Sequence, residues 1–225
     1  MARSEKIGTT ADRLSADRAR ALKVVPVSDA VVARLDRFVE LLLQWQKRIN
    51  LVAHSTVPEL WMRHVADSLQ LAEIAPDARV WVDLGSGAGF PGIVIACVLA
   101  ERAGVRVHLV ESNAKKAAFL REAVRVLDVP AEVHAKRIED VIASFASHAE
   151  AVTARALAPL SELLEMADPL LKTGAKGLFL KGQDVEAELT EAAKCWTIKA
   201  TLAPSKTSPQ ARIVVIHSAR RKDRQ

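Results

Sequence analysis

The sequence predicts an α/β fold in which a mostly parallel sheet of seven strands carries helices on both faces, preceded by a helical extension at the N-terminus. Three observations lead to this prediction. After Pro76, short runs rich in β-branched residues alternate with stretches of helical periodicity, which is typical of βαβ units. A glycine-rich turn follows the first of these runs. Before Pro76, hydrophobic residues recur at helical spacing instead.

The region before the sheet, residues 1–76, is expected to hold two helices behind a polar arm. Residues 1–25 are charged and lack a clear apolar stripe before Leu14, so we expect a loose or partly helical arm. Ser28 is a good N-cap for the first helix. Thr56, followed by Glu59 three residues later, has the pattern of a capping box for the second helix, which Pro76 ends.

Residues 77–218 form the expected sheet domain, and residues 219–225 a basic tail. The expected strands are 80–84, 105–110, 131–134, 151–154, 177–180, 197–200 and 213–217. The expected helices lie near 92–102, 114–127, 138–146, 159–171 and 184–194. A loop rich in Pro and Ser separates the last two strands, which favours a final hairpin with an antiparallel strand.

The composition is that of a globular, moderately basic protein. Half of the residues are hydrophobic and 26% are charged, which suits a full core without cross-links. We expect a cytoplasmic monomer, because no signal-peptide core is visible and the longest apolar run, residues 93–100, is too short to span a bilayer. Cys97 and Cys195 form no CxxC or Cys/His cluster, so we expect no disulfide and no metal. The net charge of +5 is compatible with an RNA partner and equally with a basic surface that has none.

The strongest functional signal lies in the segment VWVDLGSGAGFPG. Its hydrophobic strand ends in Asp83, and glycines follow at Gly85, Gly87, Gly89 and Gly92. Glycine lets the backbone turn sharply and come close to a ligand. The last three glycines match the GxGxxG pattern of dinucleotide-binding enzymes. However, this match begins late in the turn, and Asp83 would place a negative charge beside a pyrophosphate.

A cationic ligand fits this turn better than a dinucleotide. S-adenosylmethionine carries a sulfonium and an amino group, and an apolar strand followed by Asp and Gly-x-Gly-x-Gly is typical of the methyltransferases that bind it. Glu111 ends the next strand, where a carboxylate commonly accepts both ribose hydroxyls of a nucleoside cofactor; a solvent-facing Glu is the alternative. The chain has no Tyr, which excludes the Tyr-based chemistry of a competing nicotinamide-dependent oxidoreductase.

Seven motifs, in order, resemble those of the bacterial 16S ribosomal RNA guanine-N7 methyltransferases, the glucose-inhibited division protein B family. They are WQKRINLVA at 45–53, MRHVADSL at 62–69, DLGSGAGFPGI at 83–93, ESNAKKAAFL at 111–120, RIED at 137–140, TARALAPL at 153–160 and FLKG at 179–182. The resemblance runs from about residue 41 to 216, and its FPGI ending is more specific than the glycines. It implies a Rossmann-like seven-stranded methyltransferase sheet and methyl transfer from S-adenosylmethionine to guanine N7 in 16S ribosomal RNA or the small ribosomal subunit.

The candidate site residues fall into three groups. The first group is the candidate cofactor contacts. It contains Asp83, Gly87 and Gly89 of the turn and, as the resemblance implies, Gly85, Phe90, Glu111, Ile138, Glu139 and Arg155. Candidates for positioning the acceptor, none of them a certain catalytic residue, are Arg63, His64 and Asp67. Candidates for RNA binding are Lys47, Arg48, Asn50, Lys181, Arg220 and Arg221, the last two in a cluster with Lys222 and Arg224. Each group also has a structural alternative. Arg155 or Asp67 can form a structural salt bridge, and Glu139 can be an acid that complements a helix N-terminus. Lys181 can be an ordinary exposed lysine, and the basic C-terminal cluster can be a solvated tail.

The expected chemistry needs little acid–base help. Guanine N7 has a lone pair and no proton, so its attack on the methyl group needs positioning rather than a general base, and a carboxylate such as Asp83 or Asp67 can stabilise the charge that develops. Trp45, Trp61 or Phe90 can stack on the base, with core packing favoured for Trp61. Two alternatives remain open: a methyltransferase acting on another RNA or a small molecule, and a noncatalytic RNA-binding protein of ribosome assembly.

Overall fold

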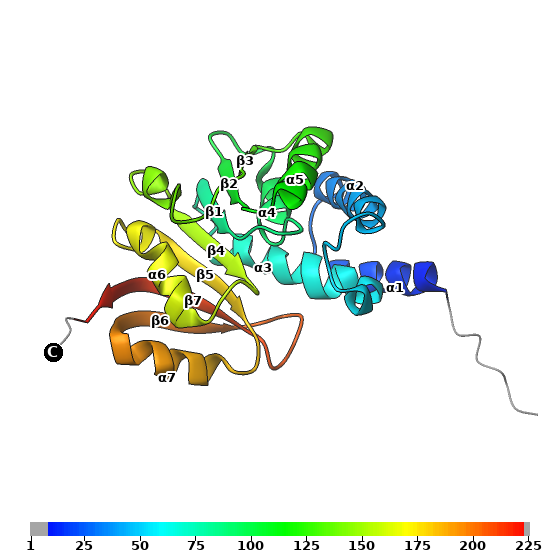
Figure 1. The fold of residues 1–225 in the computed structure, drawn as a ribbon. Helices are drawn as coiled ribbons and strands as arrows, with labels where there is room; N and C mark the ends of the chain where they lie inside the picture. The colour runs from blue at the N-terminus through cyan, green and yellow to red at the C-terminus, as the bar shows by residue number, and fades with distance from the viewer. Residues whose placement is uncertain (1–8, 223–225) are drawn as a thin grey trace, which may run out of the picture.

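The computed structural model describes residues 9–222 and contains the expected sheet of seven strands with helices on both faces (Figure 1). The strands are β1 Val80–Leu84, β2 Arg106–Val110, β3 Ala131–His134, β4 Ala151–Arg155, β5 Lys176–Lys181, β6 Trp196–Pro204 and β7 Arg212–Arg221. Their order in the sheet is β3-β2-β1-β4-β5-β7-β6. The first five strands run parallel, and β7 is antiparallel to both of its neighbours. The predicted fold class, including the final hairpin, is confirmed.

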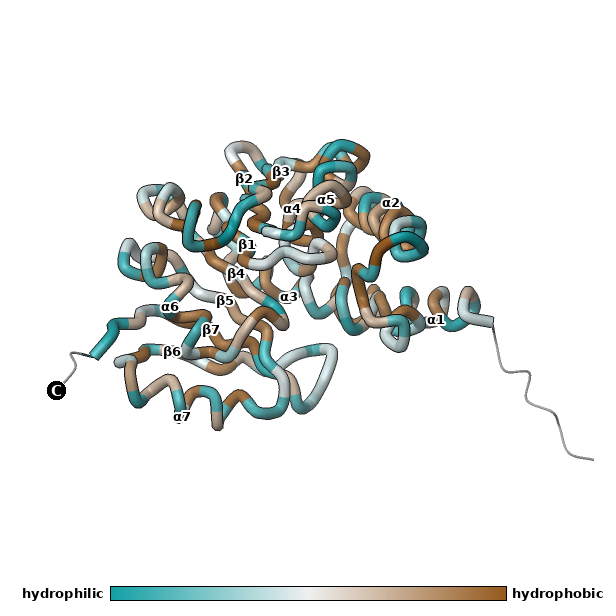
Figure 2. The backbone as a smooth tube through the Cα atoms, in the orientation of Figure 1, coloured by the Kyte–Doolittle hydropathy of each residue, from teal (hydrophilic) through white to brown (hydrophobic). Residues whose placement is uncertain are grey.

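Helices cover the sheet in two layers. They are α1 Thr10–Val24, α2 Asp29–Gln46, α3 Asp67–Ile74, α4 Gly92–Leu99, α5 Ala114–Leu127, α6 Leu160–Leu171 and α7 Val185–Cys195, with the short helices η1 His54–Glu59, η2 Trp61–Ala66 and η3 Ile142–Phe145. One hydrophobic core packs α1 to α5 against the sheet, and a second packs η3, α6 and α7 against its other face. Neighbouring strand residues point to opposite faces, so Trp81 belongs to the first core and Val82 to the second. In Figure 2 the hydrophobic colour follows the central strands and the inner sides of the helices.

The N-terminal arm is more ordered than expected over its described part. Residues 10–24 form α1, which begins with a capping box between Thr9 and Asp12. Asp17 is buried, and its Oδ2 accepts the backbone N–H of Met62 at 3.0 Å. The arm, expected to be loose or partly helical, is thus helical over residues 10–24, and α1 is held by this polar contact together with Ala21 and Val25 in the first core. Residues 1–8 lie outside the described part of the chain.

Three further expectations differ from the structure. The capping box at Thr56 is absent, because the Thr56 hydroxyl donates to the Ala53 carbonyl from inside the 3-10 helix η1. The helix expected at 138–146 is only the 3-10 turn η3, where the Ser144 hydroxyl bonds back to the Val141 carbonyl. The basic residues Arg220 and Arg221, expected in a tail, belong to β7 because they pair with β6.

The helical extension and the sheet share the first core, which runs across residue 76 without a break. α3 therefore sits at the edge of the sheet domain rather than on a separate lobe (Figure 1). Within residues 9–222, no helix has the length and apolar character needed to cross a membrane.

Candidate active site

The turn between β1 and α4 is built on glycines that no other residue can replace without strain. Gly87 has φ +54°, in the left-handed region, and a Cβ there would meet only the Gly85 carbonyl oxygen at 3.6 Å. Gly92 is the opposite case, because a Cβ there would meet Leu109 and would lie 2.7 Å from Asp83 Oδ2. The turn is therefore tightly packed underneath and open above Gly87, which is the geometry needed to seat a ligand against the backbone.

Asp83 holds this turn from below. It is 1% exposed, its Oδ1 accepts the Thr153 hydroxyl at 2.8 Å, and its Oδ2 accepts the Gly92 N–H at 3.1 Å. Burial raises the pKa of Asp83 to about 6. Both carboxylate oxygens are thus engaged inside the protein. Our expectation that Asp83 meets a cationic ligand directly finds no support in this geometry, since the residue's observed contacts are with the turn itself.

Glu111 lies against the upper side of the turn, immediately after β2. The N–H of Gly87 donates to Glu111 Oε2 at 2.8 Å, and the N–H of Asn113 donates to Oε1 at 2.7 Å. The residue is 7% exposed. A carboxylate offers about four lone-pair positions, so each oxygen keeps a position for a further donor such as a ribose hydroxyl.

An aromatic and cationic wall stands beside the turn. Phe90 packs edge-on against Phe38, with ring centroids 5.3 Å apart, and lies 5.0 Å from the ring of His64. The Arg155 guanidinium lies over the Phe90 ring at 5.9 Å from its centroid, within the range of a cation–π contact. Burial, followed by the charges of Arg155 and Arg63, lowers the pKa of His64 to about 3, so the imidazole is neutral at pH 7.

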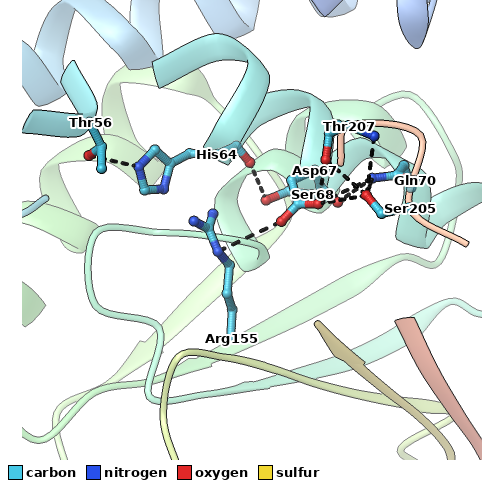
Figure 3. A network of polar contacts seen from close by, with 8 residues as sticks. All are labelled: Thr56, His64, Asp67, Ser68, Gln70, Arg155, Ser205 and Thr207. Carbon is cyan, nitrogen blue, oxygen red and sulfur yellow. Dashed lines mark hydrogen bonds and ion pairs between the residues drawn. The ribbon is translucent and has the colours of Figure 1, made fainter. Parts of the chain in front are cut away.

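Asp67, at the start of α3, anchors a polar network that Figure 3 shows from close by. Its Oδ1 accepts the Thr207 hydroxyl at 2.9 Å and lies within hydrogen-bond distance of Ser205 and Gln70, and its Oδ2 is 3.9 Å from Arg155 Nε. Burial raises the pKa of Asp67. Among residues 9–222, the buried Arg155 Nη1 has no hydrogen-bond partner. The Asp67–Arg155 ion pair is therefore loose, with donor capacity to spare.

A polar cavity of about 710 Å³ opens next to this network. Its lining includes Arg63, Asp67, Arg155, Lys181, Glu188, Thr207, Ser208 and Arg212. The cavity lies at the carboxyl ends of β4 and β5, where doubly wound sheets bind their ligands. Arg155 touches both the wall beside the turn and this cavity, so the two halves of the site meet at its side chain.

The structure places the other cofactor candidates less centrally. Ile138 is half-buried against the second core. Glu139 is exposed, with its carboxylate 3.9 Å from Arg137. Within residues 9–222 no hydrogen bond or ion pair joins either side chain to the turn, so their role as cofactor contacts stays a prediction.

The RNA-binding candidates separate into exposed and engaged residues. Lys47, Arg48 and Asn50 are exposed at the end of α2, and within residues 9–222 no hydrogen bond or ion pair joins them to Arg63 or His64. Exposed Arg220 and ion-paired Arg221, 2.9 Å from Glu165, lie on β7, while Arg224 lies outside the described residues.

Lys181 is neither a free phosphate contact nor an ordinary exposed lysine. Its side chain is 9% exposed, and its ammonium lies 2.6 Å from Glu188 and 2.7 Å from the Ala158 carbonyl. Trp61 is 2% exposed, which confirms that it packs in the core. Trp45 is half-buried and lies edge-on to Phe119 at 5.7 Å.

Sequence reasoning missed the residues that hold Asp67 in place. Ser205 and Thr207 are 138 and 140 residues away along the chain, and Gln70 reads as an ordinary helix residue. The only available signal was the Pro- and Ser-rich loop between the last two strands, which indicated a hairpin but not its contact with α3.

Solved structures show the class of the fold. The O-methyltransferase from Bacillus cereus in complex with SAH is 16% identical with a TM-score of 0.60, and covers 93% of this chain and 100% of its own. A putative O-methyltransferase from Klebsiella pneumoniae is 13% identical with a TM-score of 0.59, and covers 92% and 98%. The chain thus has the Rossmann-like fold of methyltransferases.

The family follows from the sequence comparisons. The family model described as rRNA small subunit methyltransferase G matches residues 31–214, and this chain belongs to that family. A protein named ribosomal RNA small subunit methyltransferase G from Bradyrhizobium is 59% identical over 203 residues, covering 90% of this chain and 91% of its own. One of the same name from Rhodopseudomonas palustris is 55% identical over 210 residues, covering 93% and 90%. The resemblance that the motifs indicated is confirmed.

Proposed function

We propose that this chain transfers a methyl group from S-adenosylmethionine to N7 of a guanine in the 16S ribosomal RNA of the small subunit. The observation that carries the proposal is the family match over residues 31–214. The names of the relatives support a ribosomal RNA substrate, and the ordered motifs in the sequence support guanine N7 as the acceptor atom.

The residues around the turn fit S-adenosylmethionine, which supplies an electrophilic methyl group when bound. The backbone is open above Gly87, and Glu111 keeps acceptor positions for ribose hydroxyls. Gly85, Gly89 and Phe90 complete the cradle, with Ile138, Glu139 and Arg155 as its proposed outer contacts. Asp83 serves the cradle indirectly, by fixing Gly92 and the start of α4.

The acceptor guanine is proposed to enter the polar cavity beside Arg155. Because N7 needs no deprotonation, the protein's task is to hold this atom in line with the methyl–sulfur bond, and such positioning contributes up to about 7–11 kcal/mol. Asp67 and Glu188 are both in the lining of the cavity, and Glu188 is paired with Lys181. Asp67 is therefore better placed than Asp83 or Glu188 to stabilise the positive charge on methylated guanine. Cationic Arg63 lines the same cavity, and neutral His64 lies 5.0 Å from the Phe90 ring; both help to position the base.

The RNA approaches over the basic, exposed side chains of Lys47, Arg48 and Arg220, with Asn50 as a neutral contact. Within residues 9–222 the helical extension packs into the same core as the sheet, so the folded RNA or the ribosomal particle is recognised by the surface of one body. We place this monomer in the cytoplasm, where ribosomes are assembled.

The test is methyl transfer from radiolabelled S-adenosylmethionine to small ribosomal subunits from cells that lack this protein, followed by nucleoside analysis. We expect the label in 7-methylguanosine. Glu111→Gln is expected to weaken cofactor binding about 10-fold or more, because it replaces a charged acceptor, whereas Glu162→Gln on the exposed side of α6 leaves binding and transfer unchanged. Label in another nucleoside, or none despite cofactor binding, would refute the guanine-N7 assignment.

A further inference from the structure

Two histidines and a glutamate meet on one face of the sheet, away from the turn and the cavity described above. β2 and β3 are parallel neighbours, and their register sets His108 opposite Glu132 and Val110 opposite His134. Glu132 and His134 are two residues apart in one strand, so both point to the same face. The sheet therefore gathers these three side chains although they are 24 and 26 residues apart in the sequence.

The distances between their ligand atoms match those of a metal site. His108 Nδ1 lies 3.0 Å from His134 Nε2, and Glu132 places one carboxylate oxygen 3.8 Å from His108 Nδ1 and the other 3.9 Å from His134 Nε2. Three such atoms lie within 4.8 Å of one another. Ligands bound at about 2.0–2.1 Å in tetrahedral geometry are about 3.3 Å apart, so shifts of a few tenths of an ångström would seat an ion between them.

The surroundings hold the two rings in this orientation. Phe145 of η3 stacks on His108 at 4.6 Å and meets His134 edge-on at 5.1 Å. The side chain of His108 is 6% exposed, and within residues 9–222 its Nε2 has no hydrogen-bond partner. His108 Nδ1 and His134 Nε2 lie at hydrogen-bond distance from each other, 3.0 Å, so the proton between them must leave before both nitrogens can bind an ion. Glu132 is 58% exposed, which leaves a coordination position open to solvent.

We propose that His108, Glu132 and His134 form a binding site for one divalent transition-metal ion of the zinc type. Two imidazoles and one carboxylate are a ligand set that zinc and its late first-row neighbours prefer over calcium or magnesium. The bound ion ties the edge strand β3 to β2 and so stabilises that side of the sheet. The site is independent of the proposed methyl transfer, because none of its ligands lies in the glycine turn or lines the cavity.

The experiment uses the full chain without a polyhistidine tag, after treatment with a chelator. Co²⁺ is titrated while its visible d–d absorption is recorded, and Zn²⁺ is titrated in a calorimeter. We expect one ion per chain, and on the order of 5 °C increase in melting temperature at a Zn²⁺ concentration about 100 times the Kd. His134→Asn is expected to weaken binding about 100-fold or to abolish it.

His54→Asn, at an exposed histidine in η1, is the matched control and should bind like the wild type. Glu132→Gln changes only an exposed ligand, so it tests the site even where His134→Asn disturbs the strand, and it should weaken Zn²⁺ binding about 10-fold or more. Absence of Co²⁺ and Zn²⁺ binding by the wild type at millimolar concentration, or wild-type binding by Glu132→Gln, would overturn the proposal. We expect Glu132→Gln to transfer methyl groups at the wild-type rate. Loss of metal binding can then be distinguished from loss of the proposed enzymatic function.

Discussion

The proposed cofactor side and the proposed acceptor side of the site are built in opposite ways. On the cofactor side, Asp83 has both oxygens bonded inside the protein, and Glu111 already accepts two backbone N–H groups. On the acceptor side, Asp67 and Arg155 are 3.9 Å apart, and Arg155 Nη1 has no partner among residues 9–222. A cradle whose polar groups are already bonded to one another thus lies beside a polar cavity of about 710 Å³ in which the ion pair is loose.

This difference indicates where each half obtains its specificity. The cradle is preorganised, so its ligand meets a shape that is already formed. A buried donor that has no hydrogen-bond partner costs free energy. The acceptor side is therefore stabilised most when a polar ligand supplies the missing partner. Guanine has both acceptor and donor atoms on its edges and can satisfy such a cavity.

The largest expected effect comes from breaking the cradle with Gly92→Ala. The new methyl group would meet Leu109 and lie 2.7 Å from Asp83 Oδ2, so we expect a stability loss of about 1–3 kcal/mol and at least 100-fold weaker cofactor binding, measured by thermal unfolding and by calorimetry with S-adenosylmethionine. Gly174→Ala is the control: it has no atom within 4 Å, so it costs only the backbone strain of about 1–2 kcal/mol and leaves affinity intact. Retained affinity in Gly92→Ala would show that the cradle is not rigid.

Asp67→Asn breaks the acceptor side instead. The charge is lost while the shape is kept, so the methyl-transfer rate should fall about 10–100-fold, with the affinity for S-adenosylmethionine unchanged. Single-turnover rates on small subunits and calorimetry separate the two quantities. Asp128→Asn changes an exposed residue at φ +50°, a conformation that Asn accepts, and should alter neither. An equal loss of cofactor affinity in Asp67→Asn would remove the distinction between the two sides.

The pH dependence of stability sharpens the comparison further. Burial raises the pKa of Asp83 to about 6 from 3.8, so the folded protein binds the proton more tightly than the unfolded chain. This group therefore lowers the unfolding free energy as pH rises from about 4 to 6, by on the order of 1–3 kcal/mol. Asp83→Asn should remove that slope. Urea denaturation of both proteins across this range measures it, and parallel curves would contradict the buried, proton-binding carboxyl.

His64 acts in the opposite direction and remains in both proteins. Its pKa of about 3 in the folded state, against 6.5 ordinarily, makes it a source of stability that is complete above pH 6.5 and is lost as pH falls toward 3. The difference between wild type and Asp83→Asn at each pH cancels this contribution.

The smallest effect is expected from Lys47→Gln with Arg48→Gln. Both residues are exposed, so stability should change by less than about 0.5 kcal/mol and cofactor affinity not at all. If they contact phosphates, the salt dependence of subunit binding should become shallower by about 1–2 in its logarithmic slope. Binding measured between 50 and 200 mM salt tests this, with Lys194→Gln on α7 as the control. An unchanged slope would remove the end of α2 from the RNA surface.

What the sequence predicts well is what it encodes locally. β1, the glycine turn and Glu111 lie within about 30 residues, and their residue types are enough to predict the backbone geometry. α1 was expected to be only loose or partly helical because its apolar stripe is weak; in the structure Asp17 bonds to η2, and Ala21 and Val25 join the first core. The Asp67 network and the His108 cluster were not predicted from the sequence. Their residues come together only through the placement of the hairpin and the register of the sheet.

The position of β7 has a consequence for the order in which the protein is completed during synthesis. β7 is the last strand along the chain, yet it lies between β5 and β6 in the sheet. While the ribosome is still making β7, the cradle segments from Asp83 to Glu111 have already emerged, but β6 has no neighbour to pair with, and no finished hairpin holds the residues from Thr207 to Arg212 at the cavity. A nascent chain can therefore form the cradle before the acceptor cavity exists, and competence to modify RNA arrives only with the finished hairpin.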